Sequence, residues 1–111
     1  MIKHLEAERR FDAQSLTKVS LFETERMFMD LYCLEPGQSQ RRHAHAGADK
    51  VYVVLEGTAR VQVGDEEFDV PPSHAVLAGA GVDHGLRNIT GERVVVLVFM
   101  APNPNRPSGR T

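Results

Sequence analysis

The most constraining feature of this sequence is its division into short strand-like segments by turn-forming residues, with no helical periodicity between residues 15 and 101. Segments rich in β-branched and apolar residues recur at roughly 8–12-residue spacing, and Gly or Pro ends most of them. Regular short strands without intervening helices predict an all-β, antiparallel sandwich or barrel and exclude a doubly wound α/β fold. The expected strands lie within residues 15–22, 25–34, 50–56, 58–63, 66–70, 75–78, 83–88 and 93–100.

The two ends of the chain differ from this strand-forming middle. The 111 residues suit one domain, which we place at residues 15–101. Residues 1–14 are mostly polar and predict an arm or a short helix. Residues 102–111 are Pro-rich, which predicts a flexible tail outside the core with little apolar surface to bury.

Composition excludes several classes of protein. Thirteen Lys and Arg residues against fifteen Asp and Glu residues give a formal net charge of −2, whereas nucleic-acid and membrane-surface binders usually carry a basic excess. The longest apolar run, at residues 94–101, is far shorter than the ~20 residues that span a bilayer, and no secretory signal opens the chain. The single cysteine, Cys33, excludes an internal disulfide and suits a reducing compartment. We expect a cytoplasmic protein that binds neither nucleic acid nor membranes.

Three histidines occur where strands can bring them together. His43 and His45 are two residues apart, so on a strand both imidazoles project from one face. By itself this pair is equally compatible with two surface residues. His84 lies in a separate strand-like segment after a Gly-rich turn. Three neutral imidazoles from two strands form an open metal site, with positions left for water or substrate.

The residues around these histidines resemble the two signature motifs of the cupin superfamily. Residues 37–57 contain Gly-x5-His-x-His followed by a strand and a glycine, and residues 79–88 read Gly-x-Gly-x-x-His-x-x-x-Asn. The resemblance implies a small single-domain cupin of the cupin_2 type, with the double-stranded β-helix or jelly-roll barrel of antiparallel strands and a site in the barrel mouth. We expect a divalent metal ion on His43, His45 and His84, with Zn, Ni, Fe and Mn as candidates.

Lys50 is the main departure from the family pattern. The first cupin motif has a glutamate separated from its closing glycine by six residues, and here that position is Lys50, whose ammonium repels a cation. The adjacent Asp49 points to the opposite face of a regular strand. We expect the Lys50 amine to turn toward the barrel rim and a carboxylate partner, with metal held by the histidines and water. The alternative is an amine inside the site that serves as a base or binds an anion.

Further residues are candidates for lining the pocket. If Lys50 faces inward, the two-residue period sends Tyr52 to the same side. Arg41 has the parity of His43 and His45, so an extended segment places its guanidinium at the pocket edge. Lys50, Tyr52 and Arg41 are therefore candidates for ligand binding or proton transfer.

Three functions are compatible with these features. One is a metal-dependent enzyme, dioxygenase- or isomerase-like, that acts on a small polar organic molecule. A second is a non-catalytic, sensor-type barrel that binds a small ligand, and a third is a metal-free barrel whose imidazoles and lysine bind an anion or carry out acid–base isomerisation. Residues 94–100 are apolar on both faces, which favours a homodimer that covers the outside of the barrel, with its interface on strands of the N-terminal third.

Overall fold

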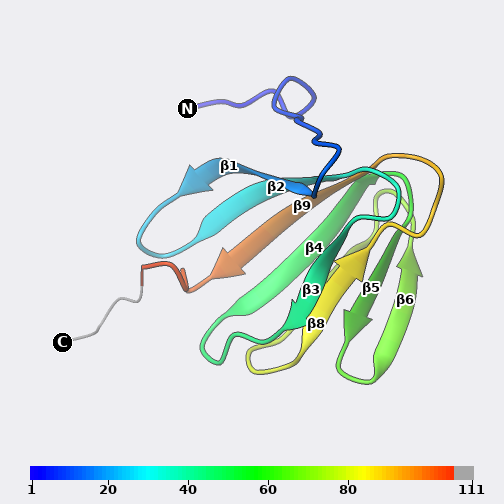
Figure 1. The fold of residues 1–111 in the computed structure, drawn as a ribbon. Coiled ribbons are helices and arrows are strands. Elements are labelled where there is room, and N and C mark those ends of the chain that lie inside the picture. The colour runs from blue at the N-terminus through cyan, green and yellow to red at the C-terminus, as the bar shows by residue number, and fades with distance from the viewer. Residues whose placement is uncertain (107–111) are drawn as a thin grey trace.

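The structure is a computed structural model that describes residues 1–106. In these residues, nine strands form two antiparallel sheets that face each other (Figure 1). The larger sheet has the strand order β1-β2-β9-β4-β7, and the smaller sheet has the order β3-β8-β5-β6. The strands are β1 (Thr17–Glu23), β2 (Phe28–Leu34), β3 (Ser39–His43), β4 (Asp49–Glu56), β5 (Ala59–Val63), β6 (Glu66–Val70), β7 (Ala75–Ala78), β8 (His84–Arg87) and β9 (Val94–Ala101).

This arrangement confirms the predicted all-β, double-stranded β-helix fold. Each segment expected to form a strand does so, and an additional strand, β3, carries His43. The last strand of the chain, β9, lies at the centre of the larger sheet, between β2 and β4. Among the described residues, no helix has the length and apolar character that a membrane crossing requires.

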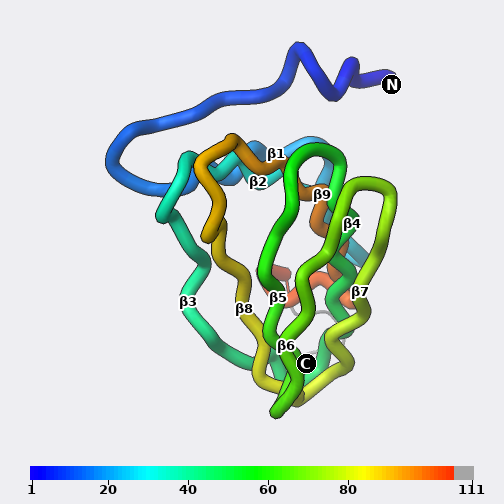
Figure 2. The backbone as a smooth tube through the Cα atoms, turned by 90° about the vertical axis from the view of Figure 1, so that its right-hand side faces the viewer, coloured from blue at the N-terminus to red at the C-terminus, as the bar shows by residue number. Residues whose placement is uncertain are grey.

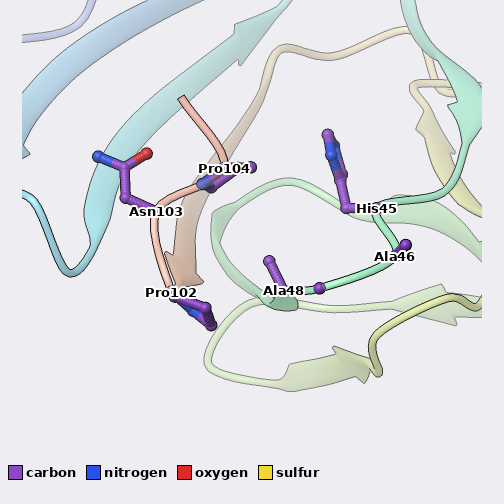
Figure 3. Close-up of a pocket in the computed structure, with 7 residues that line it drawn as sticks. His45, Ala46, Ala48, Pro102, Asn103 and Pro104 are labelled. Carbon is purple, nitrogen blue, oxygen red and sulfur yellow. The ribbon is translucent and has the colours of Figure 1, made fainter. Parts of the chain in front are cut away.

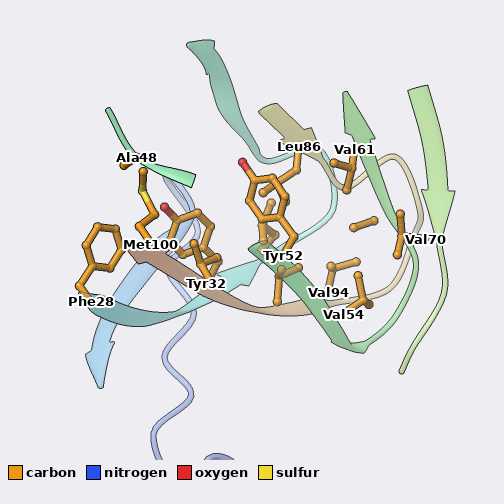
Figure 4. Packing of buried hydrophobic residues seen from close by; sticks show 14 residues of the cluster. Phe28, Tyr32, Ala48, Tyr52, Val54, Val61, Val70, Leu86, Val94 and Met100 are labelled. Atoms are coloured by element: carbon orange, nitrogen blue, oxygen red, sulfur yellow. The ribbon is translucent and has the colours of Figure 1, made fainter. Parts of the chain in front are cut away.

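The main apolar core lies between the two sheets (Figure 4). Along β4, Lys50, Tyr52 and Val54 are buried and share one face, as the two-residue period predicts. Tyr32 of β2 belongs to the same core. Figure 4 shows Tyr32 and Tyr52 rising from the larger sheet with their hydroxyl groups pointing away from it. The core therefore includes polar atoms that need partners inside the barrel.

A second, smaller apolar cluster lies on the outer face of the larger sheet. It contains the fully buried Leu31, Cys33 and Val95, against which Leu5 and Phe11 of the N-terminal arm pack. The arm lies beyond β1 and β2, on the side away from the smaller sheet (Figures 1 and 2). The centre of the larger sheet is thus buried on both faces, which explains why β9 is apolar on both faces.

Residues 102–106, the first part of the predicted tail, lie against the turn between β1 and β2. Asn103 is 2% exposed, and its amide donates hydrogen bonds to Glu23 Oε2 at 3.0 Å and to the Thr24 carbonyl at 2.7 Å. A polar side chain therefore docks this segment, although it has little apolar area to bury. The rest of the predicted tail, residues 107–111, lies outside the described residues.

Candidate functional site

Three histidine rings meet at one end of the barrel. His43 ends β3, His45 lies in the following loop, and His84 begins β8, where it pairs with His43 across the two strands. The ring centroid of His43 lies 4.8 Å from that of His45 and 4.5 Å from that of His84. One nitrogen from each ring lies within 4.8 Å of the others. The structure thus brings together the three histidines that the sequence singles out.

Hydrogen bonds fix which nitrogen of two rings carries the proton. His84 Nδ1 lies 2.9 Å from the Val82 carbonyl, and His43 Nδ1 lies 2.7 Å from the Arg41 carbonyl. A carbonyl oxygen only accepts, so each Nδ1 carries a hydrogen, and in the neutral form of either ring Nε2 keeps its lone pair. His84 Nε2 is buried and has no hydrogen-bond partner among the described residues. Such a buried lone pair is costly, and a metal ion would satisfy it.

Burial keeps the rings of His45 and His84 neutral, which is the form that binds metal. Burial lowers the pKa of His84 to about 4, helped by the positive charge of Lys50 and opposed by the hydrogen bond to Val82. Burial, followed by neighbouring positive charges, also lowers the pKa of His45. Neutral imidazoles suit divalent ions such as Zn, Ni and Fe, and three of them leave coordination positions open. The three rings therefore fit a divalent metal ion.

Lys50 lies inside the barrel and not at its rim. It is 1% exposed, and Nζ lies 5.6 Å from the ring centre of Tyr32 and 5.2 Å from that of Tyr52. Nζ donates to Gln40 Oε1 at 3.3 Å, and no carboxylate of the described residues lies within ion-pair distance. The predicted turn toward a carboxylate at the rim is therefore wrong, because two aromatic faces and an amide oxygen provide an interior site. Burial, and next the charge of Lys18, lowers the pKa of Lys50 to about 7.

Gln40 connects Lys50 with the two tyrosines. Its Oε1 also accepts a hydrogen bond from the Tyr52 hydroxyl at 2.6 Å, and its Nε2 donates to the Tyr32 hydroxyl at 2.9 Å. Gln40 is 7% exposed, so this network is enclosed by the barrel. Gln40 is not among the site residues that the sequence predicts.

A β-bulge in β3 explains both this omission and the position of Arg41. Gln40 pairs with Leu86 and His43 pairs with His84, so β3 has one more residue than β8 between these pairs. The extra residue brings Gln40 to the side of His43, and Arg41 is exposed. The predicted placing of Arg41 at the pocket edge is therefore wrong. The two consecutive arginines, Arg41 and Arg42, are the sequence signal for this bulge. Strict alternation along a strand would turn one of these charged side chains inward.

The site opens into a polar cavity of about 260 Å³. An adjacent hollow of about 320 Å³ lies between the loop at residues 45–48 and residues 102–104 (Figure 3), and His45 and Pro104 line both spaces. The C-terminal segment therefore forms one wall of the site. The residues that line the 260 Å³ cavity are Lys18, Phe28, Asp30, Tyr32, Gln40, His43, His45, Lys50, Met100, Pro104 and Asn105.

Comparison with known proteins agrees with this architecture. The family model for the cupin domain matches residues 30–100, which include the three histidines and Lys50. The chain belongs to the cupin family. Among solved structures, this cupin is similar to TT1209 from Thermus thermophilus, at 45% identity and a TM-score of 0.91, covering 93% of this chain and 98% of that one.

Two further relatives cover nearly the whole cupin. An RmlC-like cupin protein from Desulfovibrio desulfuricans is 29% identical with a TM-score of 0.81, covering 93% of this chain and 98% of that chain. An uncharacterized protein of Streptomyces coelicolor is 33% identical over 101 residues, which are 91% of this chain and 93% of that protein.

This cupin places the candidate residues at different depths. His43, His45 and Lys50 line the cavity. His84 and Tyr52 are almost fully buried, with their ring centroids 6.2 Å apart, and lie outside the cavity lining. A ligand in the cavity can therefore contact Lys50, His43 and His45 directly, whereas His84 and Tyr52 do not line the cavity.

Proposed function

We propose that this cupin holds a divalent metal ion on His43, His45 and His84 and binds a small polar organic molecule in the adjoining cavity. The buried His84 Nε2 carries this proposal, because its lone pair lacks a partner among the described residues and a nitrogen of each other ring lies within 4.8 Å. A bound divalent ion supplies Lewis-acid polarisation of a ligand oxygen. Lys50 lines this cavity and can donate hydrogen bonds to that ligand.

Metal titration tests the histidine site. We expect the wild-type protein to bind Zn²⁺ or Ni²⁺ in calorimetry, and His84→Ala to weaken binding by on the order of 100-fold, because it removes one of three protein ligands. His74→Ala is the matched control, since His74 is an exposed histidine whose Nδ1 contacts the Pro72 carbonyl. Equal metal binding by His84→Ala and the wild type would contradict the metal site.

Position 50 provides a second test of the same site. Lys50→Glu replaces an inward-facing positive charge with a carboxylate, so we expect it to raise the affinity for Zn²⁺ or Ni²⁺. Calorimetric titration of the variant and the wild type under the same conditions measures the change. Equal or weaker binding by the Glu variant would show that the side chain at position 50 does not reach the metal.

A second candidate function is a metal-free barrel that binds a small ligand, and the buried Lys50 favours it. At an effective dielectric of ~20, charges of +1 and +2 held ~5 Å apart repel by roughly 6–7 kcal/mol before solvent and counter-ions weaken the effect. Elemental analysis of protein purified without a polyhistidine tag separates the two functions. One metal ion per chain supports the first function, and metal-free protein that still binds small ligands supports the second.

A further inference from the structure

The hydrogen-bond network around Gln40 leaves donors available inside the cavity. In its charged form Lys50 Nζ can only donate, so the Gln40 atom beside it is the amide oxygen, and Gln40 Nε2 donates to the Tyr32 hydroxyl. Tyr32 Oη accepts in that bond, and its own hydrogen has no acceptor among the described residues. Lys50 uses one of its three hydrogens on Gln40, so two remain. These donors belong to buried side chains, because Lys50 is 1% exposed and Tyr32 is 2% exposed.

Positive charge exceeds negative charge around the cavity. Lys18 and Lys50 are its cationic side chains and Asp30 is its one carboxylate among the described lining residues. Lys50 has no ion-pair partner in residues 1–106. A divalent ion on the histidines would increase the positive excess further. An anionic ligand would offset this charge and accept hydrogen bonds from the available donors.

Asp30 supplies an acceptor on the same cavity wall. Burial raises the pKa of Asp30, and no described residue donates a hydrogen bond to its carboxylate. It can therefore accept a hydrogen bond from a ligand hydroxyl. The cavity volume of about 260 Å³ is below the range typical of drug-sized ligands, which restricts the ligand to a small molecule.

We propose that the cavity binds a small hydroxycarboxylic acid, with its carboxylate held by Lys50 and Tyr32 and its hydroxyl facing Asp30. This inference names the ligand class of the proposed function and rests on that function for the ligand's place beside the metal-binding histidines. Charge-assisted hydrogen bonds from Lys50 to a carboxylate are stronger than bonds between neutral groups. The negative charge of the ligand also offsets the repulsion between Lys50 and a metal ion.

A titration with glycolate and its neutral amide, glycolamide, tests the ligand class. The two molecules share a hydroxyl and nearly the same shape but differ in charge. We would titrate isotope-labelled, metal-free protein in a chelator, at a pH about one unit below the Lys50 pKa of about 7, and follow N–H correlation spectra by NMR. We expect glycolate to shift the Gln40 side-chain amide signals and to bind about tenfold or more tightly than glycolamide. Equal binding of the two molecules would overturn the proposal.

Three variants assign the binding to particular residues. We expect Lys50→Met to weaken glycolate binding by about tenfold or more and Tyr32→Phe by about threefold or more, because each removes a donor. Arg26→Met removes an equal charge from an exposed side chain that does not line the cavity, and we expect a loss of less than about threefold. Glycolate binding by Lys50→Met within about twofold of the wild type would overturn the proposal. If Lys50→Met does not fold, Tyr32→Phe and the glycolamide comparison decide the question.

Repeating the titration with Zn²⁺ separates this inference from the proposed function. If the wild type binds glycolate through Lys50 but binds no Zn²⁺, the ligand class stands and the metal site fails. If the wild type binds Zn²⁺ and glycolate binding does not depend on Lys50, the metal site stands and the hydroxycarboxylic acid proposal fails.

Discussion

Lys50 is buried without a carboxylate partner among residues 1–106, and several weaker contacts together hold it there. The rings of Tyr32 and Tyr52 lie within reach of cation–π attraction, and Gln40 Oε1 accepts a hydrogen bond from Nζ. Burial nevertheless dominates, since the pKa of Lys50 falls to about 7. At neutral pH the amine is therefore divided between its charged and neutral forms, and an anionic ligand would favour the charged form.

We expect Lys50→Met to stabilise the fold at neutral pH. The folded-state pKa of about 7 lies below the ordinary value of 10.5, so the destabilisation caused by Lys50 is fully present below about pH 7 and disappears as the pH rises through 10.5. Met retains the side-chain length without the charge, and the expected gain in unfolding free energy is on the order of 2–4 kcal/mol. Urea unfolding of both proteins across this pH range measures it. A stability difference that does not shrink with rising pH would contradict this account.

The residues that could be predicted from the sequence are those fixed by regular geometry. The spacing of His43, His45 and His84 anticipates their meeting, and the two-residue period places Tyr52 beside Lys50. The burial of the Lys50 amine was not predicted, because it depends on residues from three strands that become neighbours only in the folded barrel. A sequence shows which side a lysine takes along its own strand but not which partners will stabilise it there.

At the scale of elements, turn signals were sufficient to place every strand except β3, and insufficient to place the bulge within it. Gly and Pro mark strand ends locally, whereas the bulge exists only relative to the register of β8. The bulge decides that Gln40 and not Arg41 enters the site. Gly85 of β8 lies directly against this region, and a Cβ added there would lie 3.0 Å from the Gln40 carbonyl and 3.2 Å from Arg42 Cα.

We expect Gly85→Ala to disturb the bulge and the site together. The added methyl group crowds backbone atoms of β3, which cannot move as a flexible side chain can, so the expected loss of unfolding free energy is about 1–3 kcal/mol. Because β3 carries Gln40 and His43, Zn²⁺ binding should also weaken. Gly91→Ala is the control, since a Cβ there meets nothing within 4 Å. Thermal unfolding measures the stability and metal titration measures Zn²⁺ binding. If Gly85→Ala leaves both unchanged, β3 accommodates the added methyl group without harm to the site.

The docked segment at residues 102–106 leads to a second prediction at this scale. Asn103→Ala removes hydrogen bonds to Glu23 and Thr24 and leaves the Thr24 carbonyl near a small gap, so we expect a loss of about 1–2 kcal/mol. The exposed Asn105 provides a matched control, for which Asn105→Ala should change the stability by less than about 0.5 kcal/mol. Denaturant unfolding of the three proteins compares them. Equal stability of Asn103→Ala and the wild type would mean that the segment is not docked in solution.

At the scale of the whole molecule, the outer face of the larger sheet is only partly covered by the N-terminal arm. Leu77, Val51 and Phe99 lie in register across β7, β4 and β9, and they point away from the face that carries Lys50. Leu77 is 62% exposed. The arm covers Leu31 and its neighbours instead. The exposed Leu77 therefore extends the apolar surface available for an interface to β7, β4 and β9, beyond the strands of the N-terminal third where the sequence predicts it.

We expect the protein to form a homodimer that covers this apolar row. Sedimentation should give twice the chain mass of 12.3 kDa for the wild type and a shift toward the monomer for Leu77→Glu, because a buried carboxylate opposes association. Ile89→Glu changes a residue that is 50% exposed in the loop before β9 and should leave the dimer intact. A monomeric wild type at micromolar concentration would contradict the prediction.

The central position of β9 also has a consequence for how the protein is made. Strands β2 and β4 both pair with β9, so their facing edges stay unpaired on the ribosome until residues 94–101 have been synthesised and released from the exit tunnel. Pairing between strands so distant in the chain slows folding, and exposed edges invite association with other nascent chains. The larger sheet therefore completes only after residues 94–101 have left the tunnel, so we expect the formation of this sheet to be the folding step most exposed to association with other chains.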